Sequence, residues 1–320
     1  MAEQKIELKG KNILITGGAG FIGSNIVDRL SPDNNVFILD NFFTGSMDNL
    51  AKSQDRITVV KGDIRDKELV NDTVAKVEYI FHLAAHVGNI RSLKDPYFDM
   101  DVNIKGMLNL LEACRNNQHL KRLVYSSSAA IYGEAKYMPI DEDHPLNPES
   151  PYAVSKMAAE KYAFAYHKVY GLPTATVRYF NAYGPRQDSS EYANAVSIFL
   201  SRTMKGEPLT VFGDGEQTRD FIFISDIVNA NILAATHPAA IGQIFNISTG
   251  EVHSIKQLID VIRKVSDKEV PYGHAPFRAG EVRHSKANID KAKKLLGYKP
   301  QTGLEAGIRQ TWQALTKGRN

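Results

Sequence analysis

The stretch that decides the fold is Ile13-Leu14-Ile15-Thr16-Gly17-Gly18-Ala19-Gly20-Phe21-Ile22-Gly23. The apolar pattern resumes after it as far as Leu30, which predicts a strand, a tight turn and a helix. Gly17 allows the tight turn, Gly20 lets the backbone approach a diphosphate, and Gly23 permits close packing of helix on strand. A phosphate would lie at the helix N-terminus, where the amides point outward. The stretch therefore predicts a nucleotide site.

The glycines are spaced Gly-x-x-Gly-x-x-Gly rather than Gly-x-Gly-x-x-Gly, and by themselves they also suit a simple turn. A second apolar run, residues 36–39, ends in Asp40, twenty residues beyond Gly20. An acidic residue there binds the adenosine ribose hydroxyls, although it can also cap a turn. Because it would repel a 2′-phosphate and no arginine follows immediately, we expect NAD rather than NADP.

Composition limits the class of protein. With 320 residues, 43% of them hydrophobic, the chain can bury a large core. Its 39 basic and 36 acidic residues form no lysine or arginine block, so we expect neither a nucleic-acid nor a membrane partner. The single cysteine, Cys114, predicts a small buried side chain in a helix and a reducing, cytoplasmic location. The histidines show no metal-binding spacing, so we expect no metal.

Apolar, strand-like runs alternate with helix-period segments after Asp40. The runs are 57–60, 77–83 and 122–127, and amphipathic stretches such as 104–115 lie between them. Continuous apolar strands flanked by helices are typical of a parallel sheet buried on both faces. We predict a doubly wound α/β (Rossmann) fold. Its NAD-binding domain spans 1–180, and a smaller C-terminal α/β substrate lobe spans 181–320, some segments of which return to the first domain.

Polar and small residues stand where these strands end, which is where ligands of such a fold collect. Asp63 either accepts a hydrogen bond from the adenine amino group or caps the next helix. Asn103, early in a helix, either faces the cofactor or bonds backbone groups. Ala84 and Ala85 are small enough for a flat ring or a ribose to approach.

A second group of residues is a candidate catalytic site. Ser150 and Pro151 predict a helix start, which places Tyr152 and Lys156 four residues apart on one face. A phenol is a poor base at neutral pH, but a neighbouring ammonium and a positive nicotinamide favour the phenolate. Ser128, at the end of the fifth run, can align the reacting hydroxyl. A tyrosine and a lysine at this spacing also occur on solvated helices, but here they follow a nucleotide fingerprint.

Together these motifs resemble the extended short-chain dehydrogenases/reductases, in their nucleotide-sugar epimerase and dehydratase branch. The resemblance covers essentially the whole chain and includes residues 178–181 and 217–221. It implies that Tyr152 is the base, that Lys156 holds the nicotinamide ribose and that Ser128 orients the sugar hydroxyl. The expected cofactor contacts are Gly17, Gly20, Phe21, Ile22, Gly23, Asp40, Asn41, Asp63, Ile64, Leu83, Ala84, Ala85, Asn103, Tyr152, Lys156 and Tyr179.

Two alanines limit the set of reactions that the chain is expected to catalyse. In this family, 4,6-dehydratases carry an Asp-Glu pair directly after the position of Ser128, whereas this chain has Ala129 and Ala130. Dehydration is therefore disfavoured. Decarboxylation is disfavoured too, because that subgroup tends to carry glutamate at the position of Ala130.

Similarity to the 4-epimerases implies the substrate site. It assigns the UDP diphosphate to Arg219, Arg278 and Asn181. It assigns the uracil to Phe212 and the uridine ribose to Glu281. At the position of Ser285 the family has a size gate, and a serine there admits acetamido sugars unless it is merely a surface residue. Segments 186–188 and 281–285 resemble the UDP-N-acetylglucosamine 4-epimerase subgroup. The expected substrate contacts are Gly88, Ser128, Asn181, Arg186, Phe212, Arg219, Arg278, Glu281 and Ser285.

We therefore expect reversible C4 epimerisation through a 4-keto intermediate, of UDP-GlcNAc and UDP-GalNAc first and of UDP-glucose and UDP-galactose second. The loop 85–92 departs from common epimerase patterns. The alternative is a UDP-glucuronate 4-epimerase, with Arg186 or Arg91 on the carboxylate, or another nucleotide-sugar oxidoreductase. A non-catalytic NAD sensor is disfavoured because the catalytic trio is intact. The family usually dimerises through two long helices, which segments 104–115 and 153–169 would supply, so we expect a homodimer.

Overall fold

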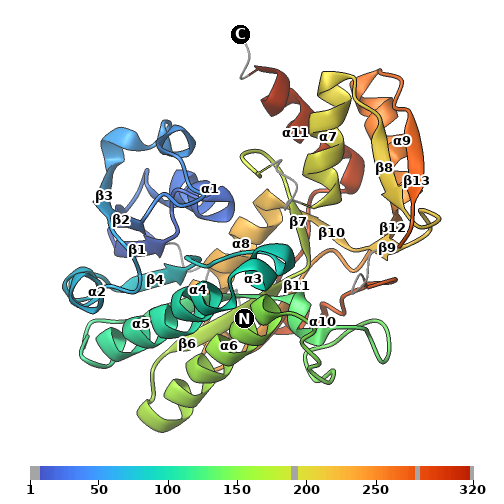
Figure 1. The fold of residues 1–320 in the computed structure, drawn as a ribbon. Coiled ribbons are helices and arrows are strands. Elements are labelled where there is room, and N and C mark those ends of the chain that lie inside the picture. Colours follow the sequence, from blue (N-terminus) through green and yellow to red (C-terminus); the bar gives the residue numbers. More distant parts are fainter. Residues whose placement is uncertain (1–7, 189–193, 278–281, 318–320) are drawn as a thin grey trace.

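The computed structural model describes residues 8–188, 194–277 and 282–317. A seven-stranded parallel sheet lies at its centre (Figure 1), so the predicted doubly wound α/β fold is confirmed. The strand order reverses between β1 and β4, which places a ligand crevice at their carboxyl ends. In spatial order the strands are β3 (Ile57–Lys61), β2 (Asn35–Asp40), β1 (Asn12–Thr16), β4 (Tyr79–His82), β5 (Arg122–Ser128), β6 (Thr174–Tyr179) and β11 (Ile244–Ile247).

Helices cover both faces of the sheet. Successive side chains of a strand point to opposite faces, so a strand of apolar residues presents an apolar surface on each face that a helix must cover. In β1, Leu14 packs into one hydrophobic core, whereas Ile13 and Ile15 pack into the other. The first core is completed by α2 (Lys67–Val74), α5 (Gly106–Arg115) and α6 (Pro151–Tyr170), and the second by α1 (Phe21–Leu30) and α8 (Ile224–Thr236).

The predicted strands after Asp40 are observed as β3, β4 and β5, with ends shifted by at most two residues. The stretch 104–115 is not one regular helix, because a π-helical turn, η3 (Asp101–Lys105), precedes α5. Cys114 is buried in α5, as predicted. Shorter elements of this half are α3 (Asn89–Lys94), α4 (Pro96–Met100), and the 3-10 turns η1 (Met47–Leu50), η2 (Gln54–Arg56) and η4 (Ala129–Tyr132).

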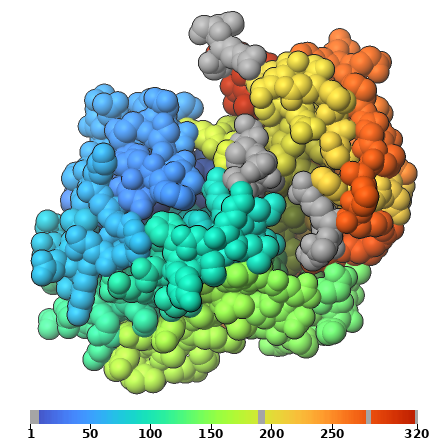
Figure 2. Space-filling view, viewed as in Figure 1, coloured from blue at the N-terminus to red at the C-terminus, as the bar shows by residue number. Residues whose placement is uncertain are grey.

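The C-terminal part adds three small strand pairs beside the sheet, and β11 and α8 return to the sheet itself (Figure 1). In the space-filling view, its yellow and orange residues lie across from the blue N-terminal residues, with the green residues below both (Figure 2). No helix in the described ranges is long and apolar enough to cross a membrane. The pairs are β7 (Asn181–Tyr183) with β10 (Phe221–Phe223), β8 (Leu209–Phe212) with β13 (Tyr272–Ala275), and β9 (Thr218–Arg219) with β12 (His253–Ser254). The other elements are α7 (Ala195–Lys205), η5 (Pro238–Ala240), α9 (Ile255–Ser266), α10 (Asp290–Leu296) and α11 (Leu304–Lys317).

Candidate active site

Two cavities adjoin at the carboxyl edge of the sheet. The first has a volume of about 680 Å³ and follows the ends of β1, β2 and β4. The second has a volume of about 300 Å³ and begins at the end of β5. Tyr179, the last residue of β6, lines both cavities, so a ligand in one lies beside a ligand in the other.

The glycine turn between β1 and α1 lines the first cavity. Gly17 has a φ of +69°, and a Cβ added to it would lie 2.7 Å from the backbone nitrogen of Ala84. A Cβ on Gly23 would collide with the carbonyl oxygen of Gly17. Within the described chain no side chain caps α1, whose N-cap residue is Gly20. The backbone N–H groups of its first turn can therefore bind an anion such as a diphosphate.

Asp40 ends β2 with its side chain buried in the wall of the first cavity. Its two carboxylate oxygens accept hydrogen bonds from the N–H of Ala19 at 2.9 Å and the N–H of Phe42 at 2.8 Å. Burial raises the pKa of Asp40, and these two bonds partly offset the rise. A carboxylate oxygen has more than one lone pair. The backbone thus fixes the group while leaving it able to accept from ribose hydroxyls.

Asp63 also lines this cavity, but it does not cap α2. The N-cap is Asp66, whose side chain accepts two backbone N–H groups, so the capping alternative for Asp63 was wrong. Arg65 forms a two-pronged ion pair with Asp63 at 2.9 and 3.0 Å, and the amide of Asn41 donates to it at 2.8 Å. The pKa of Asp63 is lowered to about 2, and the hydrogen bond from Arg65 is the largest cause.

All the expected cofactor contacts except Asn103 line the first cavity. The side chain of Asn103 accepts from the N–H of His86 at 2.8 Å and donates to the carbonyl of His86 at 3.1 Å. It also donates to the hydroxyl of Ser155 at 2.9 Å. Asn103 therefore joins the segment after β4 to α6 through backbone groups of His86 and the side chain of Ser155. Its role toward a cofactor stays a prediction.

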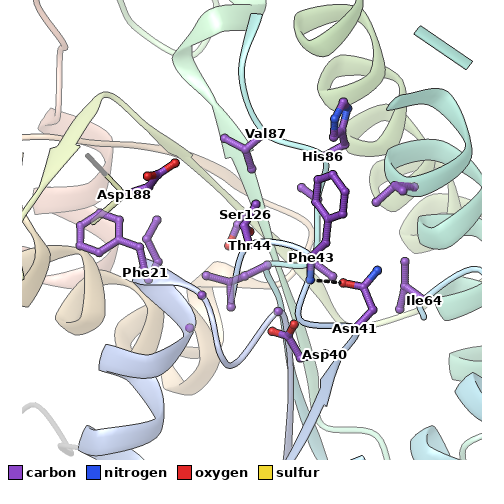
Figure 3. Close-up of a pocket in the computed structure, with 18 of the residues that line it drawn as sticks. Phe21, Asp40, Asn41, Phe43, Thr44, Ile64, His86, Val87, Ser126 and Asp188 are labelled. Atoms are coloured by element: carbon purple, nitrogen blue, oxygen red, sulfur yellow. Dashed lines mark hydrogen bonds between the residues drawn. The ribbon is translucent and has the colours of Figure 1, made fainter. Parts of the chain in front are cut away.

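An aromatic group on the cavity wall was missed by the sequence analysis. The ring centroid of His86 lies 5.0 Å from that of Phe98 and 6.0 Å from that of Phe43, which is 60% exposed (Figure 3). Phe43 lies on the same loop as Asn41, whose side chain accepts its N–H at 3.0 Å. The sequence did contain a signal for this group, namely the apolar ring of Phe43 in the polar loop after Asp40. An exposed aromatic side chain at such a place suits a flat ligand.

The catalytic trio lies where the cavities meet. Ser150 caps α6 by accepting the N–H of Ala153 at 3.2 Å, and Pro151 occupies the first helical position, as predicted. Tyr152 and Lys156 line the first cavity, on the same helix. Ser128 lines the second cavity and lies close enough to the phenol of Tyr152 to lower its pKa. A hydroxyl placed at this junction can therefore exchange a proton with Tyr152.

The electrostatics differ from the sequence-based expectation in one respect. Burial raises the pKa of Tyr152 to about 12 in the protein alone, although the hydrogen bond with Ser128 acts against this. Burial also lowers the pKa of Lys156 to about 7, while Asp99 and Glu160 favour its ammonium. The desolvation of the phenol thus outweighs the help expected from the lysine, and a further positive charge is needed to make Tyr152 an effective base.

The second cavity brings together Ser128, Asn181, Arg219 and Ser285. The side chain of Asn181 donates to the carbonyl of Asp220 at 3.1 Å. Nη1 of Arg219 donates to two backbone carbonyls at 3.0 and 3.1 Å, and Arg219 is among the residues that line the cavity. A guanidinium group is well suited to bind a diphosphate.

Four other expected substrate contacts lie elsewhere or outside the described residues. Gly88 is the N-cap residue of α3 and has a φ of +112°; its two neighbours in the chain line the two cavities. Phe212 ends β8 and lines neither cavity. Arg278 and Glu281 lie outside the described residues.

Arg186 lies in the first cavity rather than the second. Its guanidinium is paired with Asp28 of α1. Arg91 lines the same cavity and pairs at 3.2 Å with Asp188, which is labelled in Figure 3. Neither of the two guanidinium groups considered for a uronate carboxylate therefore lines the second cavity. The described ranges also contain no group of three side chains that could hold a metal ion.

Comparison with known proteins agrees with this geometry. A family model described as GDP-mannose 4,6 dehydratase matches residues 14–311. A UDP-glucose 4-epimerase of Mycolicibacterium smegmatis is 40% identical over 303 residues, which are 93% of this chain and 96% of that protein.

Two solved structures are similar over almost the whole chain. The UDP-N-acetylglucosamine 4-epimerase of Methanobrevibacter ruminantium, in complex with UDP-N-acetylmuramic acid, has a TM-score of 0.93 at 37% identity and covers 97% of this chain and 100% of its own. The UDP-glucuronic acid 4-epimerase of Bacillus cereus, in complex with UDP-glucuronic acid and NAD, has a TM-score of 0.89 at 32% identity and covers 96% and 99%.

Proposed function

The chain belongs to the GDP-mannose 4,6-dehydratase family of NAD-dependent epimerases and dehydratases, and we propose that it inverts C4 of a UDP-hexose reversibly. One observation carries the proposal. Ser128 and Tyr152 lie at the junction of a dinucleotide-sized cavity and a second cavity that holds Arg219. A sugar whose diphosphate lies at Arg219 thus presents its ring to the proton-transfer pair.

The first cavity fits NAD. The uncapped turn of α1 suits the diphosphate, and Asp40 suits an unphosphorylated ribose. Lys156 and Tyr152 line the same cavity and would hold the nicotinamide ribose. When bound, NAD supplies a reversible hydride acceptor and, in its oxidised form, the positive charge that favours the phenolate of Tyr152.

The chain's own residues carry out the proton chemistry and hold the substrate. Ser128 aligns the 4-hydroxyl, and Tyr152 takes its proton as the 4-keto sugar forms, then returns it. Arg219 and Asn181 hold the diphosphate while the ring turns about it. Inversion needs this anchoring together with space beside Ser128, and the small residues Ala129 and Ala130 line the cavity there.

The same two alanines favour epimerisation over dehydration, since neither supplies the acid or base that the loss of water needs. The alternative substrate, UDP-glucuronate, is favoured by the similarity to the Bacillus cereus enzyme. The ion pairs of Arg186 and Arg91 weigh against it, because both lie in the first cavity. Ser285 lines the second cavity and leaves space for an acetamido group, so we assign UDP-GlcNAc and UDP-GalNAc as preferred substrates.

We also propose a homodimer. Helix α6 exposes Val154, Tyr162, Phe164 and Val169, which are 39–69% accessible in the single chain. An apolar helix face of this kind suits packing against its own copy. Light scattering tests this, and a monomer would refute it. The cytoplasmic location expected from Cys114 stays a prediction.

Proton NMR of the C4 configuration tests the activity. The purified protein is incubated without added cofactor with UDP-GlcNAc, UDP-glucose or UDP-glucuronate. A galacto-configured product from the first two supports the proposal, and conversion of glucuronate alone would replace the substrate assignment. If no sugar reacts while NAD is bound, the proposed reaction is wrong.

A further inference from the structure

The second cavity carries a carboxylate that the proposed mechanism does not use. Glu149 immediately precedes the helix cap Ser150 and lies three residues before Tyr152. It lines the same cavity as Ser128 and Ser285. Its carboxylate is therefore close to the place where C4 of a sugar must lie.

Local contacts hold this carboxylate at the cavity wall. Its Oε1 accepts from the side-chain amide of Asn147 at 3.2 Å and from the N–H of Glu134 at 3.4 Å. Gly133 lines the cavity next to this carboxylate with a φ of +62°, and a Cβ added there would lie 3.2 Å from Oε1. Oε2 accepts no hydrogen bond from the part of the chain that the structure describes, so it can accept one from a ligand.

No ion pair to Glu149 is formed by the residues that the structure describes. Asn89 and Ser150, the polar residues beside it, are neutral and bond each other at 2.9 Å. Among the described lining residues the other charged side chain is Arg219, which is assigned to the diphosphate. Of the two charged residues among the described lining, Glu149 therefore belongs to the proposed sugar end and Arg219 to the proposed nucleotide end.

We propose that Glu149 determines the substrate class by accepting uncharged hexoses and rejecting hexuronates. This inference rests on the proposed function. The reacting C4 must lie within hydrogen-bond reach of Ser128 and Tyr152, and the C6 group is attached to the neighbouring C5. A C6 hydroxymethyl group can donate to Oε2, whereas a C6 carboxylate brings a second negative charge to the same end. Specificity then comes from repulsion as well as from a new contact.

Coulomb's law sets the expected size of the effect. Two like charges about 7 Å apart, at effective dielectric constants between about 80 and 20, change a binding ratio about threefold to fiftyfold. Because salt screens such a pair when it is exposed, the effect is greatest at low ionic strength, about 0.01 M, where the Debye length is about 30 Å.

The test compares dissociation constants of UDP-glucuronate and UDP-glucose, by calorimetry on the NAD-loaded protein, for the wild type and for Glu149→Gln. This change removes the charge but keeps an oxygen for the N–H of Glu134. We expect the preference for UDP-glucose over UDP-glucuronate to fall at least about threefold in the variant. In the wild type, we also expect high salt to reduce the preference for UDP-glucose over UDP-glucuronate. Glu207→Gln, an exposed site after α7, is the matched control and should leave the ratio unchanged.

An unchanged ratio in Glu149→Gln overturns the inference, and so does a wild type that binds UDP-glucuronate more tightly. The measurement does not depend on turnover. A wild type that binds these nucleotide sugars but epimerises neither them nor UDP-GlcNAc refutes the proposed function, while the shift of the ratio still decides the role of Glu149.

Discussion

The guanidinium of Arg178 in β6 donates two hydrogen bonds to the carboxylate of Glu160 in α6, at 2.9 and 2.6 Å, and both side chains are buried. Glu160 lies one helical turn beyond Lys156, and Arg178 directly precedes Tyr179, which lines both cavities. The ion pair therefore connects the catalytic helix to the strand at the junction of the cavities.

Glu160→Gln should lower the free energy of unfolding by about 3–5 kcal/mol, because it leaves a buried guanidinium without its counter-charge. Urea denaturation measures the loss. The control is Arg309→Ala, which removes the exposed pair with Glu305 and should cost less than about 1 kcal/mol. Equal losses in the two variants would mean that the buried pair contributes little.

Tyr152→Phe should reduce kcat by at least about 10²-fold, because it removes the group that accepts the 4-hydroxyl proton. The ring remains, so the fold and the bound NAD should be retained. Product NMR measures the activity, and the nucleotide released on denaturation measures the cofactor. Substantial residual turnover would refute the assigned role.

Lys156→Met should abolish activity yet stabilise the fold. The folded pKa of Lys156 is about 7, whereas an unfolded lysine has a pKa of about 10.4. Between these values the unfolded chain binds more protons, so the wild type gains stability as the pH rises through this window.

The variant lacks this dependence, and its stability advantage over the wild type should be about 3 kcal/mol greater at about pH 6 than at about pH 9. Urea titrations at the two pH values, after removal of bound nucleotide, measure the difference. A constant difference would show that Lys156 keeps an ordinary pKa.

Asp40→Asn should weaken NAD binding at least about tenfold. Both carboxylate oxygens accept backbone N–H groups. The side-chain amide of asparagine would place its NH₂ group against one of these N–H groups, where two donors would face each other. Calorimetry with NAD measures the loss, and Asp48→Asn, an exposed change in η1, is the control. If NADP binds the wild type as tightly as NAD does, Asp40 does not determine the cofactor.

Ser285→Tyr should reduce kcat/KM for UDP-GlcNAc at least about tenfold while UDP-glucose stays within about threefold, because the ring would occupy the space of the acetamido group. Ser285 donates its N–H to the carbonyl of Thr218 at 3.1 Å, and this backbone contact survives the change. Ser285→Ala is the control for the hydroxyl. Equal losses for both sugars would show that the position is not a size gate.

The sequence by itself determined the nucleotide fold and the catalytic helix of this protein. Both depend on local order: three glycines within one strand-turn-helix, and a cap, a proline, Tyr152 and Lys156 within two helical turns. Such spacings have one favourable backbone conformation, so they can be recognised without knowing what packs against them.

Only the tertiary structure decided the partners of the polar residues. Asp63 and Asp66 are both suitable helix caps, but Asn41, 22 residues away, and Arg65 bind the carboxylate of Asp63. Likewise Arg186 lies in the cofactor cavity because its partner is Asp28, 158 residues away. Glu149 has no distinctive local signal, and it becomes part of the sugar cavity only when α6, β5 and the C-terminal segment meet. These contacts depend on long-range packing, which no local pattern of residue types specifies.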